Sequence, residues 1–327
     1  MRIAIVRLSA LGDIFQTMVI LQFIKKKYTN STIDWFVDSR FADALDNECF
    51  IDNIYSLDIK NTSGFSFPIK FFKLIIKLKK IESYDIVIDF QGLIKSAIVT
   101  SLIPGETKYG FDKDSCKERL SAVFYDFKVS VGYEVNVIER YLRLVDFSLG
   151  VEVHRDDIFN KASFFQLSDS NTNKYIIFVL GASFKSKIYP LNKFAEVAES
   201  IPERIIAIWH TSKEKEMSDE LVKMNSNIES KEVRNMRELK QIVFGSKLVI
   251  GGDTGPVHLA WALNIPSITI FGCTPAYRNA YITSFNKVVE SESSVNPMKI
   301  NKNDFSIRDL ESNKIVKIAK ELLGYLN

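Results

Sequence analysis

The sequence has little cysteine and little histidine. Its 327 residues include three cysteines (Cys49, Cys116 and Cys273) and three histidines, and all six lie far apart. No CxxC pair occurs, so neither a disulfide framework nor a cysteine zinc site is expected, and free cysteines are typical of a reducing cytosol. Isolated histidines also argue against a histidine metal cluster. The sequence therefore predicts no metal site, and nothing in it indicates a cofactor.

The sequence also lacks a strong net charge and a long apolar run. Lysine and arginine number 43 against 40 aspartates and glutamates, which gives a net charge of +3, so no basic field indicates a nucleic-acid partner. No apolar stretch approaches the roughly 20 residues needed to span a membrane. The first residues, MRIAIVRL, run directly into a predicted strand and are too short for a secretory signal. We expect a cytoplasmic protein.

What the sequence does contain is a regular alternation of short apolar strands and helices. The alternation is interrupted by a polar stretch at 151–174 and then restarts. Such alternation predicts parallel sheets covered by helices on both faces, and the length suits two domains of about 150 residues each. We therefore predict an α/β protein with two doubly wound domains, 1–160 and 161–327. Ligands would bind beyond the carboxyl ends of the strands, in a cleft between the domains.

The sequence predicts three helices that bear on the fold and on a membrane contact. Apolar spacing predicts one from Ile14 onward and a long one over about 305–326, which we expect to be able to pack back on the first domain. A third, at 67–81, is basic and amphipathic. It fits an anionic membrane surface, but the pattern equally fits a helix packed on the core with solvated lysines. Its lysines recur at spacings of three and four: Lys70, Lys73, Lys77 and Lys80.

The stretch 249–263 is a buried strand, a glycine-rich turn and a helix, VIGGDTGPVHLAWAL. Its glycines let backbone amides approach a ligand, and the helix after Pro256 offers free N–H groups that suit an anion. The pattern is neither GxGxxG nor a Walker loop, so it supports neither a dinucleotide fold nor a P-loop ATPase. A plain turn with Asp253 or Thr254 as the helix N-cap is equally consistent.

A second turn of this kind lies at 180–194, LGASFKSKIYPLNKF. Ser183, Lys185 and Lys187 precede a helix that begins at a proline, and a lysine there can neutralise a phosphate. Solvated loop lysines are the alternative. Two anion-suited turns in one domain favour a phosphorylated ligand.

Two predicted strand ends of the first domain carry carboxylates. Asp89 and Gln91 come just before a sharp turn at Gly92, where they fit either a ligand site or a helix cap. Asp13, with Gln16 three residues later, matches a capping box with Asp13 at the N-cap. A general base at Asp13 is also consistent, because a helix N-terminus favours an ionised carboxylate.

Three stretches together resemble one enzyme family. They are RLSALGDIFQT (7–17), YDIVIDFQGLIKSA (84–97) and GGDTGPVHLAWAL (251–263), and the similarity covers nearly the whole chain in order. The chain resembles the ADP-heptose:lipopolysaccharide heptosyltransferases of glycosyltransferase family 9, and its first stretch resembles type I rather than type II. The resemblance implies a GT-B fold of two Rossmann-like domains. It also implies inverting, metal-independent transfer of L-glycero-D-manno-heptose from ADP-heptose to the Kdo of Kdo-lipid A.

The same resemblance implies a location and roles for particular residues. The enzyme would lie on the cytoplasmic face of the inner membrane, and the basic helix 67–81 would contact the membrane surface. Asp13 matches the catalytic base, and Lys187 matches the lysine at the donor phosphates. The other matched positions would contact the donor (Ser183, Met236 at the adenine, Asp253, Thr254, Gly255 and His258) or the acceptor (Ser9, Gly12, Gln91 and Lys117).

Some positions depart from the family pattern. Gln16 stands where histidine is usual, and Lys117 replaces an arginine, which keeps the charge but loses a bidentate grip. Ser212 replaces a glutamate that usually holds the ribose, and Ala182 lacks the hydroxyl that Ser183 keeps. Two other functions stay open: a GT-B enzyme with a different nucleotide sugar, and a non-catalytic nucleotide- or glycan-binding protein.

Overall fold

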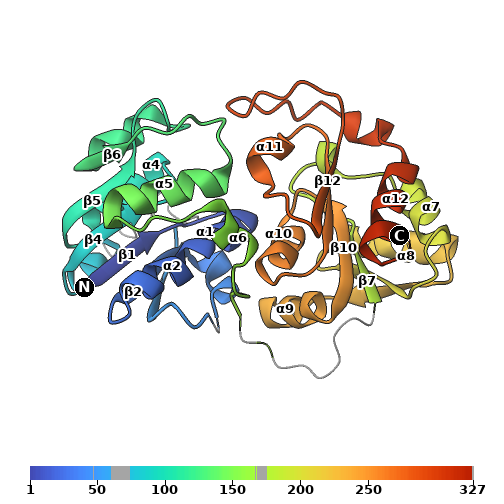
Figure 1. Cartoon of the computed structure of the whole chain (residues 1–327), viewed down its shortest axis with the longest axis horizontal. Coiled ribbons are helices and arrows are strands. Elements are labelled where there is room, and N and C mark those ends of the chain that lie inside the picture. Colours follow the sequence, from blue (N-terminus) through green and yellow to red (C-terminus); the bar gives the residue numbers. More distant parts are fainter. Residues whose placement is uncertain (47, 60–73, 166, 168–174, 326–327) are drawn as a thin grey trace. The chain divides into compact units, whose positions relative to one another are not determined.

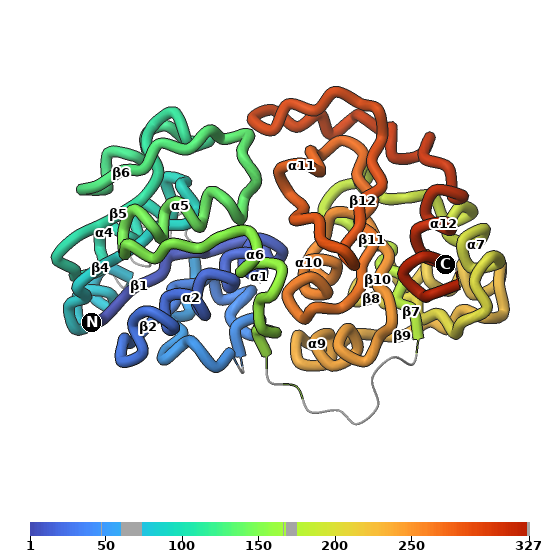
Figure 2. Tube along the Cα trace, in the orientation of Figure 1, coloured from blue at the N-terminus to red at the C-terminus, as the bar shows by residue number. Residues whose placement is uncertain are grey.

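The computed structural model describes residues 1–46, 48–59, 74–165, 167 and 175–325. They form two compact units, Met1–Gln166 and Leu167–Asn327. Each unit is a sheet of strands between helices (Figures 1 and 2). The division falls within the polar stretch 151–174. No helix among the described residues combines the length and the apolarity needed to cross a membrane.

The first unit contains a six-stranded sheet in the order β3-β2-β1-β4-β5-β6, with each neighbouring pair parallel. The order reverses between β1 and β4, and such a switch point is where open α/β sheets bind ligands. β3 and β6 were not predicted, because they are short and largely solvent-facing. The strands are β1 (Arg2–Val6), β2 (Thr32–Asp38), β3 (Asn53–Leu57), β4 (Tyr84–Asp89), β5 (Gly105–Phe111) and β6 (Phe127–Val129).

Helices cover this sheet in two groups. Leu78, from the helical residues 74–79, lies in one cluster with Val6 of β1 and Val99 of α4, whereas α1, α2 and α5 pack against one another. The remaining segments are short. The elements are α1 (Leu11–Thr17), α2 (Val19–Lys27), α4 (Ile94–Leu102), α5 (Val137–Leu149), α6 (Arg155–Phe159), and the 3-10 helices η1 (Ser39–Ala44) and η2 (Arg119–Phe124).

Three expectations for the first unit change. The helix predicted from Ile14 begins at Leu11 and is divided at Met18. The polar stretch is not entirely irregular, since it contains α6. Residues 67–73 of the predicted basic helix lie outside the described residues. In the described part Leu78 is fully buried and Leu74 is half-buried, whereas Ile76 is exposed.

The second unit repeats the topology of the first. Its six-stranded sheet has the order β12-β11-β10-β7-β8-β9, again with parallel neighbours, and the order reverses between β7 and β10. β9 and β12 are the strands that the sequence did not reveal. The strands are β7 (Tyr175–Val179), β8 (Ile205–Trp209), β9 (Ile228–Glu232), β10 (Ser246–Gly252), β11 (Ser267–Phe271) and β12 (Asn286–Glu290).

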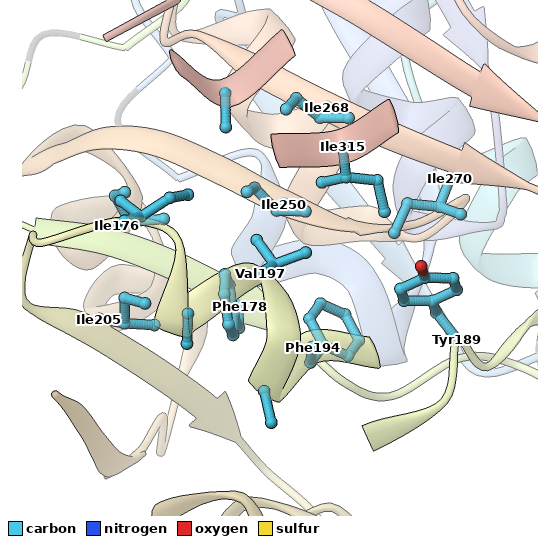
Figure 3. Packing of buried hydrophobic residues seen from close by; sticks show 14 of the residues in the cluster. Ile176, Phe178, Tyr189, Phe194, Val197, Ile205, Ile250, Ile268, Ile270 and Ile315 are labelled. Carbon is cyan, nitrogen blue, oxygen red and sulfur yellow. The ribbon is translucent and has the colours of Figure 1, made fainter. Parts of the chain in front are cut away.

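The core of the second unit lies between this sheet and the helices α7, α8 and α12. Phe178 and Ile250 of the sheet meet Phe194 of α7 and Ile315 of α12 (Figure 3). The remaining helices α9 and α10 pack against each other. The helices are η3 (Lys185–Lys187), α7 (Leu191–Glu199), α8 (Ser212–Met224), α9 (Met236–Phe244), α10 (Gly255–Ala262), α11 (Ala276–Asn279), η4 (Ser306–Asp309) and α12 (Ser312–Leu322).

The C-terminal region differs from the single long helix predicted over 305–326. The chain forms η4, becomes extended at Leu310, and only then enters α12. Ile315, Val316 and Ala319 of α12 lie in the core of the second unit. The last helix therefore packs on the core of its own unit, and its packing on the first domain stays a prediction.

Arg140 of α5 anchors two loops, the one that follows β5 and the one that follows β6. Its guanidinium is almost completely buried and donates hydrogen bonds to the carbonyls of Ser115, Val131 and Gly132 at 2.6–2.7 Å. It also lies over the ring of Phe111, 4.4 Å from the centroid. One charged side chain thus supplies donors to three backbone acceptors and ties two loops to α5.

Replacing Arg140 by methionine should destabilise the first unit. Three buried carbonyls would lose their donor, so we expect a loss on the order of 3 kcal/mol in the free energy of unfolding. The control is Arg143→Met, since Arg143 lies exposed on the same helix. Urea unfolding measures both variants, and equal losses for the two would contradict the anchoring role.

Candidate functional site

The first candidate site lies at the switch point of the first sheet, where β1 and β4 end side by side. Val6 pairs with Asp89 as the last residues of the two strands. Beyond them, Gln91 accepts a hydrogen bond from the backbone N–H of Leu8 (2.8 Å) and donates one to the Ser9 hydroxyl (3.3 Å). The fold therefore brings the predicted acceptor residues Ser9 and Gln91 into contact.

Asp13 lies on the first turn of α1, but it is not the N-cap. Ala10 is the N-cap and Asp13 is the third residue of the helix. The Oδ2 atom of Asp13 accepts a hydrogen bond from the backbone N–H of Ala10 at 3.1 Å. The predicted capping box with Gln16 is wrong, and Gln16 is buried. Asp13 Oδ1 forms an ion pair with Arg7 Nη2 at 2.9 Å, and the carboxylate keeps 38% of its surface exposed. Gly12 precedes it in the same turn.

Asp89 holds the turn after β4 together rather than capping the next helix. Its carboxylate accepts hydrogen bonds from the backbone N–H groups of Gln91 and Gly92 and from the Tyr125 hydroxyl. Burial raises the pKa of Asp89, although these hydrogen bonds oppose the shift. Gly92 has φ +67°, a conformation that side chains rarely adopt, so glycine is required there.

Lys117 lies in the loop that packs on this turn. A Cβ added to Gly92 would meet the sulfur of Cys116 at 3.1 Å, and the Ser121 hydroxyl donates to the Gly92 carbonyl at 3.2 Å. Lys117 itself is exposed between these two contacts. The predicted acceptor lysine is therefore carried next to the ends of β1 and β4.

The second candidate site lies at the switch point between β7 and β10, around a buried carboxylate. Asp253 Oδ2 forms an ion pair with Lys187 Nζ at 2.8 Å and accepts hydrogen bonds from Thr274 (3.0 Å) and Asn279 (3.3 Å). Its Oδ1 lies 2.9 Å from Nε2 of His258. Asp253 is therefore the centre of a cluster drawn from four segments, and it does not act as a helix cap.

The electrostatics of the second site follow from these contacts. Burial by itself raises the pKa of the Asp253 carboxyl, but the charge of Lys187 and the hydrogen bond from His258 outweigh it. The pKa of Asp253 therefore lies well below its usual range. A carboxylate so held is a fixed negative charge, so it positions Lys187 and His258 rather than exchanging protons.

The N-terminus of α10 adjoins this cluster. Thr254 is its N-cap residue, Gly255 begins the helix and Pro256 follows, so the first turn leaves backbone N–H groups unpaired within the helix. A Cβ added to Gly252 would come within 2.7 Å of the Lys187 carbonyl, so glycine allows the two turns to approach. Ser183 is exposed in the same turn as Lys187.

Two further predicted positions lie at the same edge of the second sheet. Met236 is half-buried and begins α9, after β9. Ser212 begins α8, after β8, but the carboxylate at this helix end is Glu214, which accepts the backbone N–H groups of His210 and Thr211. All these residues share one edge because every strand of the sheet runs in the same direction.

The described residues contain no group of three or more histidine, cysteine, aspartate or glutamate side chains placed to hold a metal ion. Among the charged groups at the two sites, the sequence interpretation missed Arg7, and among the polar groups it missed Thr274 and Asn279. The signal for Arg7 was present, because it is a charged residue at the end of a buried strand. Thr274 and Asn279 follow β11, and no local pattern marks them.

Comparison with known proteins decides the family. A family profile described as "Glycosyltransferase family 9 (heptosyltransferase)" matches residues 71–305. The chain is 38% identical to the lipopolysaccharide heptosyltransferase 1 of Campylobacter coli, over 99% of each chain. The chain belongs to glycosyltransferase family 9. It is therefore an enzyme, a glycosyltransferase, and the resemblance seen in its motifs is confirmed.

Other members of this family agree in sequence and fold. The lipopolysaccharide heptosyltransferase 1 of Escherichia coli K12 is 27% identical over 84% of this chain and 88% of that protein. The solved structure of E. coli heptosyltransferase WaaC with ADP matches with a TM-score of 0.81 at 24% identity, covering 98% of this chain and 100% of that chain. The predicted GT-B class of two Rossmann-like domains is confirmed, while the predicted cleft stays a prediction.

Removing the partner of the buried carboxylate should cost stability in a pH-dependent way. In Lys187→Met the buried charge of Asp253 loses its cation, so we expect a loss of about 3–5 kcal/mol in the free energy of unfolding at pH 7. A lowered folded pKa contributes stability above the unfolded value of about 3.9, and that stability is lost as the pH falls. The difference from wild type should therefore shrink below about pH 4.

Urea unfolding at pH 7 and at about pH 3, below the unfolded pKa of an aspartate, measures this difference. Lys185→Met is the matched control, because Lys185 is exposed in the same short helix. The double variant Lys187→Met/Asp253→Asn should recover part of the stability, since no charge is then left buried. The electrostatic explanation would be refuted if Lys187→Met and the double variant lost the same free energy of unfolding, and lost it equally at both pH values.

Proposed function

We propose that the enzyme transfers L-glycero-D-manno-heptose from ADP-heptose to the Kdo of Kdo-lipid A, with inversion and without a metal ion. The observation that carries this proposal is the similarity, over nearly the full length, to the lipopolysaccharide heptosyltransferase 1 of Campylobacter coli. The solved E. coli WaaC structures contain ADP and ADP-2-deoxy-2-fluoro heptose, which supports the choice of donor. The acceptor follows from the resemblance in the motifs.

An inverting transfer needs a base on one side of the sugar and a stabilised leaving group on the other. Each unit supplies one of these two groups. Asp13 would take the proton of the acceptor hydroxyl while that oxygen bonds to the anomeric carbon. The bond from this carbon to the β-phosphate oxygen breaks at the same time, and ADP leaves with the electron pair. The partial exposure of the Asp13 carboxylate supports this role.

The second unit would bind the donor. Amides at the start of α10, with Thr254 and Gly255, suit the diphosphate, and Lys187 offsets the charge that grows on it. Ser183 adds a hydroxyl in the same turn, and Met236 would line the adenine. Asp253 and His258 would act mainly by holding Lys187 and the turn in place, given the contacts of the Asp253 cluster.

The acceptor would meet the first unit around Asp13. Ser9 and Gln91 hold each other at the ends of β1 and β4, and Gly12 leaves the first turn of α1 without a side chain beside the base. Lys117 offers an exposed positive charge to an acidic sugar. Kdo carries a carboxylate, so a cation beside the base suits it.

A lipid-anchored acceptor is met at a membrane surface, and the segment 67–81 supplies the charge for it. Leu74, Leu78 and Ile81 of this segment pack on the core of the first unit, and Ile76 is its one exposed apolar side chain among the described residues. Lys77 and Lys80 are exposed. We therefore propose peripheral binding on the cytoplasmic face of the inner membrane by electrostatic attraction to anionic lipids rather than by insertion of an apolar face.

Replacing Asp13 by asparagine should abolish transfer and spare donor binding. We expect a fall of about 10²–10⁴ in kcat, the contribution of a general base, with an unchanged thermal shift on adding ADP. Asp146→Asn, an exposed carboxylate on α5, is the control and should keep wild-type kcat. Heptose transfer is measured with ADP-heptose and Kdo-lipid A. Transfer at the wild-type rate would remove Asp13 as the base.

The thermal shifts in this experiment also test the donor. ADP at a concentration of about 100 times Kd should stabilise the enzyme by about 2.7 kcal/mol, whereas UDP and GDP should not. An enzyme stabilised equally by UDP would instead favour a different nucleotide sugar. If the enzyme binds ADP but Asp13→Asn does not slow transfer, the proposed donor stands and the role of Asp13 as the base falls.

Charge reversal in the basic segment should weaken membrane binding. The triple variant of Lys70, Lys73 and Lys77 to glutamate should lose most of its co-sedimentation with vesicles that contain anionic lipid, because each lysine contributes about 1 kcal/mol near such a surface. The control carries the same change in charge on α8, at Lys213, Lys215 and Lys223. Binding that is insensitive to anionic lipid, or equal loss in both variants, would contradict the proposal.

A further inference from the structure

Arg7 is the buried cation nearest to the proposed base in the described structure, and β1 and its neighbours hold it rigidly. Its backbone N–H donates to the carbonyl of Phe36 at 3.2 Å, and its own carbonyl accepts the Trp35 ring N–H at 3.1 Å. Its side chain is only 7% exposed. The backbone that carries the guanidinium is therefore held in place by hydrogen bonds.

Three contacts orient this guanidinium. Nη1 donates to the carbonyl of Phe90 at 2.7 Å, the ring of Tyr141 lies 5.5 Å from the central carbon, and Nη2 meets Asp13 Oδ1 at 2.9 Å. Burial works against the charge of Arg7, but Asp13 and its other neighbours outweigh this effect and raise its pKa. Two of the contacts are to the protein framework, and the third is to an exposed carboxylate.

The consequence for Asp13 is a fixed orientation. One carboxylate oxygen is held by Arg7 and the other by the backbone N–H of Ala10. A charge-assisted hydrogen bond from a rigid guanidinium defines direction as well as energy. The carboxylate keeps 38% of its surface exposed, which leaves room for an acceptor hydroxyl to approach it.

We propose that Arg7 is a positioning residue for transfer: it acts through Asp13 by holding that carboxylate in the orientation that accepts the proton. The inference rests on the proposed role of Asp13 as the base. A position error of about 1 Å in a reacting group costs on the order of 10²-fold in rate. Losing the Arg7 contact should therefore lower kcat without changing the KM for the donor, which binds in the second unit.

The test is a double-mutant cycle on the steady-state kinetics of transfer with ADP-heptose and Kdo-lipid A. Arg7→Met should lower kcat by about 10–100-fold, with the donor KM within twofold of wild type. Arg7→Lys keeps a charge but not the planar fork, so it should fall between wild type and Arg7→Met. In the Asp13→Asn background, Arg7→Met should cost less than threefold more, because residues that act as one unit are not additive.

Arg2→Met is the matched control. Arg2 begins the same strand, forms ion pairs with Asp34 and Glu82, and lies over the ring of Tyr84, but it is at the opposite end of β1. It should keep wild-type kcat. Thermal shift with ADP checks that each variant is folded. If Arg7→Met does not fold, the cycle is run with Arg7→Lys, whose smaller loss should likewise vanish beside Asp13→Asn.

The outcomes separate this inference from the proposed function. If Asp13→Asn transfers at the wild-type rate, Asp13 is not the base and both proposals fall. If Asp13→Asn is inactive while Arg7→Met keeps wild-type kcat, only the role of Arg7 is overturned. Arg7 would likewise be only a structural ion pair if the losses in kcat multiplied fully in the double variant. The same conclusion would follow if Arg7→Met and Arg2→Met lowered kcat equally.

Discussion

Parallel pairing of the strands is the constraint on which both candidate sites depend. It brings the carboxyl ends of a sheet to one edge, and the reversal of strand order leaves a gap between the connections there. Val6 ends opposite Asp89, and Gly251 lies opposite Val179. The turns that follow these pairs place residues far apart in sequence within hydrogen-bond reach, as with Lys187 and Asp253.

The two sites use a carboxylate in opposite ways. In the first unit the cation, Arg7, is buried and the carboxylate of Asp13 is partly exposed. In the second unit the carboxylate of Asp253 is buried, with both oxygens occupied by neighbouring side chains. The same topology therefore yields one acid group free to meet a substrate and one that serves as an internal counter-ion.

Much of the fold was predictable, because the central strands are continuous apolar runs between helices of clear periodicity. The edge strands were not. β9 reads IESKE and is largely exposed, so it shows no apolar run, and β6 has only three residues. The start of α1 was also misplaced, since Asp13 was expected at the N-cap. The Ala10 carbonyl accepts the first helical bond from Ile14, and Asp13 supports the turn from inside.

The site was predictable to the extent that motifs mark strand ends. Asp13, Lys187 and Asp253 were candidates on this ground and His258 through the resemblance, and the fold brings the last three together. Contacts made by segments without a motif were invisible, and so was the pairing of Arg7 with Asp13, because its geometry depends on the carbonyl of Phe90 from another strand. A local pattern gives the residue type, but not its partner in space.

The saturated Asp253 cluster has a consequence for how a diphosphate would arrive. Lys187 already has a counter-ion, so under the proposed function an incoming phosphate would replace or share an existing partner rather than meet an unpaired positive charge. Such an exchange spares the cation the full cost of losing water, because that cost was met when the chain folded. Departure of the product would then be the same exchange in reverse, with the ion pair between Lys187 and Asp253 formed again.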